Sequence, residues 1–239
     1  FNYLDRWYWT VEAVNDDGNA VVDPPYSFEI RQAPTAISTF PWTENFDAAL
    51  TLPTDWRMVD VDGAGTYWQG STAYSHSSPN SFMHSYSTAV PEGQNGWLIT
   101  PPVQIPTTGH YVLSWWNYNV YPDWMVYNGL KVNTTDDPND PNWVELWAPT
   151  TVTAAWSNAV VNITPYAGQT VYFAFNYQGY DADNWYIDDV SIYELLVDEF
   201  PPTITHLPVL NTPRTDINYL VYAEIADDPS WNNPIGGAN

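Results

Sequence analysis

Short runs of alternating or continuous apolar residues, each ended by a cluster of Pro, Gly, Asn or Asp, constrain this chain more than any other feature. Examples are residues 7–11, 111–115, 170–175 and 185–193. Runs of this length with this punctuation are typical of strands, and the periodicity of amphipathic helices is nearly absent. The 21 prolines fit strand edges and linkers, where a missing N–H costs least. The sequence therefore predicts an all-β protein built from sandwiches.

The aromatic content supplies the material for a large core. Aromatic residues make up 17% of the 239-residue chain, and 14 of them are Trp. Such side chains bury large areas, and some of them could instead form an exposed stacking surface. The chain has no cysteine, which removes disulfides, thiol catalysis and Cys-based zinc sites together.

The net charge narrows the range of partners. The chain has 28 acidic and 5 basic residues, a formal net charge of −23. Nucleic acids and anionic membrane surfaces would be repelled by it. Acidic side chains that cluster favour hard cations such as Ca²⁺. No apolar run approaches the ~20 residues that a membrane span needs.

The chain divides into three blocks. In residues 1–36, the spacing of Trp7, Val11, Asn15 and Gly18 resembles the last strands of a fibronectin type III domain. Residues 37–196 form the central block. Residues 200–239 begin with a Pro-Pro linker and continue as the opening strands of an Ig-like sandwich. We expect both ends to be incomplete domains, either pieces of a longer array or edges that pair with other copies of the chain by strand addition.

The central block contains a set of motifs in a fixed order. They are Glu44-Asn45-Phe46-Asp47, Leu52-Pro53, Trp56, residues 59–65, Trp68, residues 96–102, residues 163–171 and residues 185–190. Together they resemble the cleaved-adhesin domain, a MAM-like jelly-roll also found in "choice-of-anchor J" surface proteins. The resemblance implies a jelly-roll β-sandwich, structural Ca²⁺, an extracellular location, and adhesion to a protein or glycan of a host or neighbouring cell.

Acids from both ends of the central block are candidate metal ligands. The first and last strands of a jelly-roll lie near each other, so Glu44 and Asp47 can converge with Asp188 and Asp189. Successive strand residues face opposite sides, so only one of Asp188 and Asp189 is expected to point inward. Buried carboxylates need a counter-charge, and no Lys or Arg lies near either motif. Either a Ca²⁺ supplies that charge or these acids sit at the surface and cap turns.

Two acidic loops can likewise be interpreted either as Ca²⁺ sites or as turns. Asp60 and Asp62 stand at alternate positions before Gly63, as at the start of a calcium loop. The later Glu of an EF-hand is missing, and a simple turn explains the pattern equally well. Asp183 lies in an Asp- and Asn-rich loop before the last strand, and it is either a loop former or a ligand.

An aromatic-rich stretch gives the candidate ligand-binding residues. Alternation places either Trp115 or Trp116 in the core. Tyr121, Trp124 and Tyr127 follow in a predicted loop, where exposed rings would suit stacking on sugars or packing against another protein.

Catalytic motifs are missing from the sequence. It has neither a Gly-x-Ser-x-Gly elbow nor a His-Glu-x-x-His helix, and its four histidines are scattered. We therefore expect a non-catalytic adhesive or structural segment of a large, multidomain bacterial surface or secreted protein. The alternatives are a carbohydrate-binding module of a secreted hydrolase, and a subunit of an extracellular filament.

Overall fold

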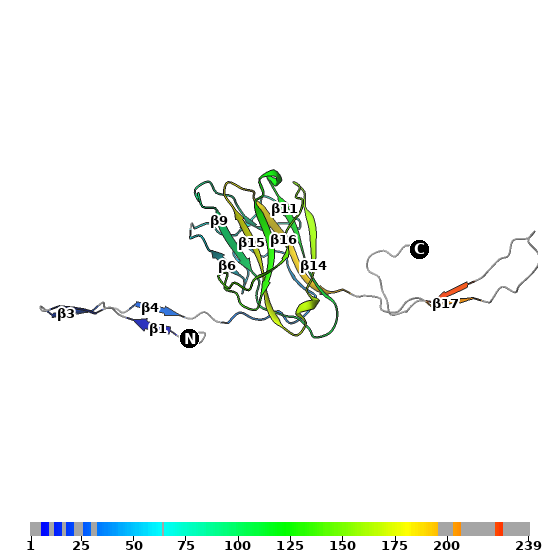
Figure 1. The fold of residues 1–239 in the computed structure, drawn as a ribbon, viewed down its shortest axis with the longest axis horizontal. Coiled ribbons are helices and arrows are strands. Elements are labelled where there is room, and N and C mark those ends of the chain that lie inside the picture. The colour runs from blue at the N-terminus through cyan, green and yellow to red at the C-terminus, as the bar shows by residue number, and fades with distance from the viewer. Residues whose placement is uncertain are drawn as a thin grey trace, which may run out of the picture.

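The structure is a computed structural model that describes residues 33–63 and 65–195 in full and, outside them, the backbones of six short strands. The central block forms a β-sandwich of two six-stranded sheets, and every strand pair is antiparallel (Figure 1). Its helical residues, in the described part, are two 3₁₀ turns, η1 (Pro122–Trp124) and η2 (Thr164–Tyr166). The all-β jelly-roll prediction is confirmed.

The first sheet contains β6, β9, β10, β12, β13 and β15. Its strand order is β13 (Val144–Trp147), β12 (Tyr127–Asn133), β15 (Thr170–Gly179), β9 (Gln94–Ile99) and β6 (Arg57–Asp60), with β10 (Val103–Gln104) also paired to β15.

The second sheet brings together the two ends of the central block. Its strand order is β14 (Ser157–Asn162), β11 (Tyr111–Asn119), β16 (Trp185–Glu194), β8 (Ser81–His84) and β7 (Gln69–Ser71), with β5 (Trp42–Glu44) also paired to β16. The last strand, β16, therefore lies inside the sheet and contacts β11, β8 and the first strand, β5.

Aromatic side chains fill the space between the sheets. Trp68, Trp115 and Trp185 are almost completely buried, and the rings of Trp68 and Trp185 meet edge to face at 5.2 Å. Trp115 contacts Trp147 and Phe175 in the same way, at 5.0 and 5.5 Å. Such pairs add to the hydrophobic burial that stabilises the domain. The aromatic excess of the sequence is therefore largely core material.

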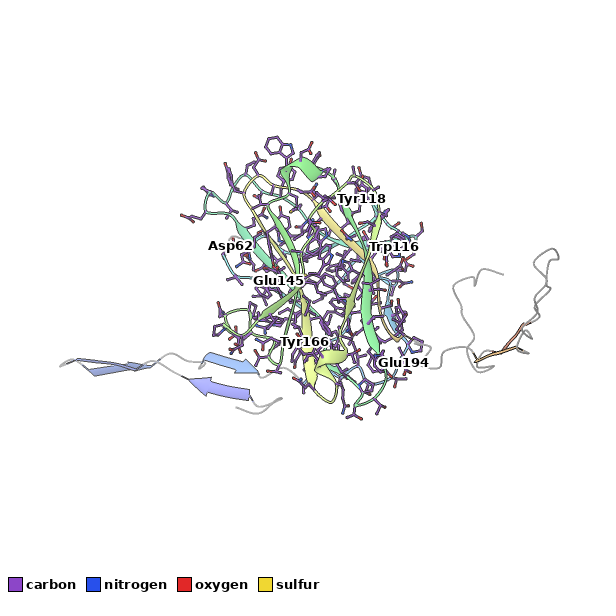
Figure 2. The ribbon with its side chains drawn as sticks, turned by 45° about the vertical axis from the view of Figure 1, so that its right-hand side comes forward. Asp62, Trp116, Tyr118, Glu145, Tyr166 and Glu194 are labelled. Atoms are coloured by element: carbon purple, nitrogen blue, oxygen red, sulfur yellow. The ribbon has the colours of Figure 1, made fainter. Side chains whose placement is uncertain are left out.

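Strand alternation decides which aromatic side chains face outward. Trp115 is fully buried, whereas its neighbour Trp116 and the next residue but one, Tyr118, lie on the outer face of the second sheet. Figure 2 shows both on the side of the sandwich away from Asp62 and Glu145, which belong to the other layer. The prediction that one of Trp115 and Trp116 is a core residue is confirmed.

The flanking blocks are described only as strand pairs. These are β1 (Arg6–Trp9) with β4 (Tyr26–Glu29), β2 (Glu12–Asn15) with β3 (Gly18–Val21), and β17 (Thr203–His206) with β18 (Ala223–Ala226). The rest of residues 1–32 and 196–239 lies outside the described part. The fibronectin type III and Ig-like assignments stay predictions. No helix in the described part is long and apolar enough to cross a membrane.

Core packing predicts a contrast between two neighbouring strands. Leu113 on β11 is fully buried, and Val160 on the adjacent β14 is 50% exposed. We expect Leu113→Ala to lower the free energy of unfolding by about 2–5 kcal/mol, because it leaves a cavity between the sheets. Val160→Ala should change it by less than about 0.5 kcal/mol. Urea denaturation of both variants checks this, and equal effects would contradict the assigned strand faces.

Candidate functional site: two acidic pairs and an aromatic loop cluster

The pairing of β5 with β16 brings the predicted acids to neighbouring positions on the second sheet, where β16 passes from its pairing with β8 to its pairing with β5. Glu44, the last residue of β5, lies opposite Val190, which directly follows Asp188 and Asp189. The two motifs are 144 positions apart in the sequence, counted from Glu44 to Asp188. Their approach follows from the position of β16 inside the sheet.

Asp188 is the buried member of its pair. Its side chain is fully buried, and its carboxylate accepts hydrogen bonds from the backbone N–H groups of His76, Ser77 and Asp189 at 2.8, 3.1 and 2.8 Å. Burial, followed by the nearby charge of Asp189, raises the pKa of Asp188 to about 7. The N–H donors offset only part of this cost. A carboxylate at this position is therefore poorly compensated by the protein itself.

Asp189 turns toward the loop before β8. Its φ of +48° is uncommon for a residue other than glycine. One carboxylate oxygen lies 2.6 Å from Nδ1 of His76, and the other accepts a hydrogen bond from the Ser77 hydroxyl at 2.8 Å. The ring of His76 stacks on Trp116 with the centroids 3.8 Å apart. Asp188 is the more buried of the two, but it follows the core residue Ile187 and pairs with the outward-facing Trp116, so residues 76–77 bury it on the outer face of the sheet. Simple strand alternation does not describe the two acids, because the register shifts between Ser114 and Trp116 and Asp189 has a positive φ.

The other pair, Glu44 and Asp47, holds the far end of the same loop. Burial raises the pKa of Glu44, and the nearby Asp47 raises it further. Asp47 accepts a hydrogen bond from the backbone N–H of Asn80 at 3.1 Å, and the Asn80 side chain donates to the carbonyls of Phe46 and Asp47. Phe46 has a φ of +56°, an unusual backbone conformation for a bulky residue.

Residues 76–80 thus connect the two acidic pairs, with Asp188 and Asp189 at one end and Asp47 at the other. Within the described residues, no three His, Asp or Glu side chains form a group that could hold a metal ion. His76 lies at Asp189, but the Arg and Lys side chains that the structure describes, Arg57 and Lys131, both lie elsewhere. Arg57 pairs with Asp136 at 2.8 Å, and Lys131 lies over the rings of Trp97 and Tyr127.

Asp60 and Asp62 organise a loop of their own. Asp60 accepts hydrogen bonds from the backbone N–H groups of Gly63 and Gly65 at 3.2 and 2.5 Å. Both glycines have φ between +70° and +80°, a conformation that glycine adopts without strain. Asp62 accepts from the N–H of Asn95 at 2.6 Å. These contacts favour the interpretation of Asp60 and Asp62 as residues that form a turn.

Asp183 lies apart from both pairs and supports the aromatic loop. Its fully buried carboxylate accepts hydrogen bonds from the Asn119 side chain and from the backbone N–H of Tyr121, the latter at 2.6 Å. Its carbonyl accepts from the Tyr177 hydroxyl at 2.8 Å. Burial raises the pKa of Asp183, against the opposing effect of these donors.

Two of the three predicted ligand-binding aromatics meet in a cavity. Tyr121 and Trp124 line a cavity of about 310 Å³ together with Tyr86, Asp181 and Ala182.

The third, Tyr127, lies on β12 in the first sheet. Its hydroxyl donates to Glu145 at 2.7 Å, and its ring packs near Lys131. Burial and the contact with Glu145 raise the pKa of Tyr127. Tyr127 is not among the residues that line the cavity.

A larger cavity of about 730 Å³ lies against β5 and the segment that follows it. Trp42, Phe46, Leu52 and Trp56 contribute apolar walls, and Glu44 contributes a carboxylate.

Sequence reasoning missed His76, Ser77 and Asn80 at the acidic pairs and Tyr86 and Asp181 at the cavity. The Pro and Asn before β8 mark a turn but do not reveal which acids that turn contacts. The contacts span 33 to 113 positions in the sequence. The residues next to His76, Ser77, Asn80, Tyr86 and Asp181 in the sequence therefore do not indicate which distant residues they contact.

Comparison with known families agrees with this geometry. The profile of the Cleaved Adhesin Domain matches residues 39–192, which is almost the whole sandwich. The chain belongs to the cleaved adhesin family. The resemblance inferred from the ordered motifs is confirmed.

Two kinds of relative place this cleaved adhesin chain among known proteins. It is 27% identical over 190 residues to Hemagglutinin A of Porphyromonas gingivalis, covering 67% of the chain and 7% of that protein. Its fold is similar to the K1 and K3 cleaved adhesin domains of Lys-gingipain from P. gingivalis W83. The TM-scores are 0.54 and 0.52 and the identities 18% and 21%, covering 66% and 64% of the chain and 99% and 96% of those domains. The chain spans less than a tenth of the curated relatives it matches.

The buried Asp188 predicts an unusual pH dependence for this cleaved adhesin in EDTA. Its pKa rises from 3.8 to about 7 on folding, so between these values the folded state keeps a proton that the unfolded state has lost. Asp188 therefore makes the free energy of unfolding fall as the pH rises from about 4 to about 7. Asp188→Asn should remove this contribution.

Urea denaturation of both proteins across this pH range measures it. The difference between the two curves isolates Asp188, because other titrating groups are common to both. Parallel curves would contradict the assigned environment of Asp188.

Proposed function

We propose that this chain is a non-catalytic adhesive segment of a larger, multidomain bacterial protein that is secreted or exposed on the cell surface. Its sandwich would hold structural Ca²⁺ and bind a protein or glycan of a host or neighbouring cell. The observation that carries the proposal is the match of nearly the whole sandwich to an adhesin family. A relative named Hemagglutinin A supports a role at cell surfaces.

The arrangement around His76 supports a non-catalytic role. A Ser, a His and an Asp lie together here, which are the residue types of a hydrolase triad. In such a triad the serine hydroxyl bonds to the histidine, which activates it. Here the Ser77 hydroxyl donates to Asp189, and the His76 ring is stacked on Trp116. The serine hydroxyl is bonded to the carboxylate and not to the histidine, and these contacts favour a structural role for residues 76–77.

The environment of the acidic pairs supports a bound cation. Asp188 and Glu44 are carboxyls whose burial raises their pKa values, and neither Arg57 nor Lys131 reaches them. A cation beside them would supply the missing positive charge. Because no three acidic or histidine side chains converge in the described part, some of the six to eight oxygens of Ca²⁺ would come from backbone carbonyls or Asn80.

We propose that the ion lies between the two acidic pairs and takes one carboxylate from each, Asp47 and Asp188, among its ligands. The other candidates, Asp60, Asp62 and Asp183, are each hydrogen-bonded to loops of their own. When bound, Ca²⁺ would supply positive charge and link the first strand, the last strand and residues 76–80. Such a link would stabilise the fold and take no part in a reaction.

Calcium should therefore raise the stability of the whole chain. At a free Ca²⁺ concentration of 100 Kd, the free energy of unfolding should exceed that in EDTA by about 2.7 kcal/mol. Asp188→Asn and Asp47→Asn should lose most of this gain. Glu92→Gln, which changes an exposed acid outside the pairs, should keep it. Calorimetry with Ca²⁺ and with EDTA measures the effect, and identical melting temperatures would exclude the ion.

Adhesion itself can be tested with the intact chain. Fluorescently labelled protein should bind to erythrocytes in Ca²⁺ buffer, as the name of the Hemagglutinin A relatives suggests, and binding should saturate with protein concentration. Flow cytometry measures this, with heat-denatured protein as the control. No saturable binding to erythrocytes or to immobilised extracellular glycoproteins by the folded chain would overturn the adhesive function.

A further inference from the structure

We propose that the cavity between Tyr86, Tyr121 and Trp124 binds a neutral sugar ring of a glycan. This inference rests on the proposed adhesive function and assigns to it a ligand class and a site. The three side chains come from two loops that are far apart in the sequence, residues 85–87 and 121–124, and Asp181 completes the wall.

The aromatic rings of the cavity are open to a ligand. Trp124 is 62% exposed, Tyr121 45% and Tyr86 39%, which is unusual for such large apolar side chains gathered at one place. The rings of Tyr86 and Tyr121 meet edge to face at 6.0 Å and 79°, so they form two walls at nearly a right angle. Exposed ring faces offer apolar surface for the C–H faces of a sugar, and the Tyr hydroxyls and Asp181 offer hydrogen-bond partners for its hydroxyl groups.

The loops that carry these rings are fixed by buried polar contacts. The fully buried Asp183 accepts from the backbone N–H of Tyr121 at 2.6 Å. The next residue, Asn184, accepts from the backbone N–H of Tyr86 at 3.0 Å through its side chain and from that of Val120 at 3.2 Å through its carbonyl. One short segment before β16 therefore positions both aromatic loops. A site held in this way binds without first ordering its loops, which favours affinity.

The size and charge of the cavity select the ligand. Its volume of about 310 Å³ is at the lower end of small-ligand sites, which suits one or two sugar rings. A stable protein interface would need roughly 800 Å² from each partner. The lining contains Asp181 and no Lys or Arg, and the chain has a net charge of −23. Sialylated or sulfated glycans would be repelled, so the ligand is a neutral one.

A second group of outward-facing aromatic side chains already packs on other rings of the protein. On the outer face of the second sheet, His76 stacks on Trp116 at 3.8 Å and Tyr74 stacks on Tyr118 at 4.8 Å. These contacts cover ring faces that a sugar would need. The side chains of Tyr86, Tyr121 and Trp124 at the cavity keep 39% to 62% of their surface exposed.

A glycan array tests the inference with the whole chain in Ca²⁺ buffer. The probes are neutral oligosaccharides of glucose, galactose, mannose, xylose or N-acetylglucosamine, and sialylated and sulfated glycans. We expect binding to neutral probes only.

Trp124→Ala and Tyr86→Ala should each weaken that binding about tenfold, which corresponds to ~1.4 kcal/mol. Trp124→Phe should retain part of it. Tyr67→Ala, which removes a 51% exposed ring outside the cavity, should not change it.

The outcomes separate this inference from the adhesive function. Near-ultraviolet circular dichroism first confirms that each variant is folded. Three results would overturn the neutral-sugar site: preference for acidic probes, no binding to any neutral probe, or equal binding by Trp124→Ala and the unsubstituted chain (the parent). Erythrocyte binding is measured in parallel. If the parent adheres and Trp124→Ala adheres equally well, another surface such as a protein-binding face is responsible. If the parent does not adhere but binds neutral probes through Trp124, the sugar site stands without the proposed function.

Discussion

The position of β16 inside the second sheet is the constraint on which the rest of the molecule depends. This last strand of the sandwich pairs with β11 on one side and with β8 and β5 on the other. Its inward side chains, among them Trp185, Ile187 and Val190, are part of the core. The same strand carries Asp188 and Asp189 and is preceded by Asp183 and Asn184. The placement of β16 that completes the second sheet therefore also positions the residues of both candidate sites.

Acids of the same type have different roles here because their surroundings differ. Asp60 accepts backbone N–H groups in an exposed loop, where a carboxylate costs little. Asp183 is buried beneath the aromatic cavity and holds a loop in place. Asp188 is equally buried but has Asp189 as its neighbour, which leaves excess negative charge on β16 between its pairings with β8 and β5. Of the three environments, that of Asp188 is the one in which a cation would compensate the most buried negative charge.

The aromatic residues divide in a similar way. Trp115 and Trp185 stabilise the sandwich from inside, and Trp116 anchors residues 76–77 on the outside. Trp124 and Tyr121 remain exposed although the loop beneath them is fixed by a buried carboxylate. Exposed apolar rings on a well-ordered loop are costly for solubility unless they meet a ligand. This contrast favours the cavity as the binding surface of the domain.

Much of the fold could be read from the sequence, because strand periodicity and turn residues are local signals. They predicted an all-β sandwich and the inward position of one residue of the Trp115–Trp116 pair. The approach of Glu44 and Asp47 to Asp188 and Asp189 was expected from the jelly-roll topology that the family resemblance implies. The partners of the acids could not be read in this way. His76, Ser77 and Asn80 belong to an ordinary turn in the sequence, and Tyr86 is one Tyr among 18.

Only the tertiary structure separated Tyr127 from Tyr121 and Trp124 and placed Tyr86 beside them. It also assigned Asp183 to the aromatic loop. The physical reason is that alternation decides the face of a residue within its own strand. Which loops meet at the end of a sandwich depends on how the strands are ordered in its sheets.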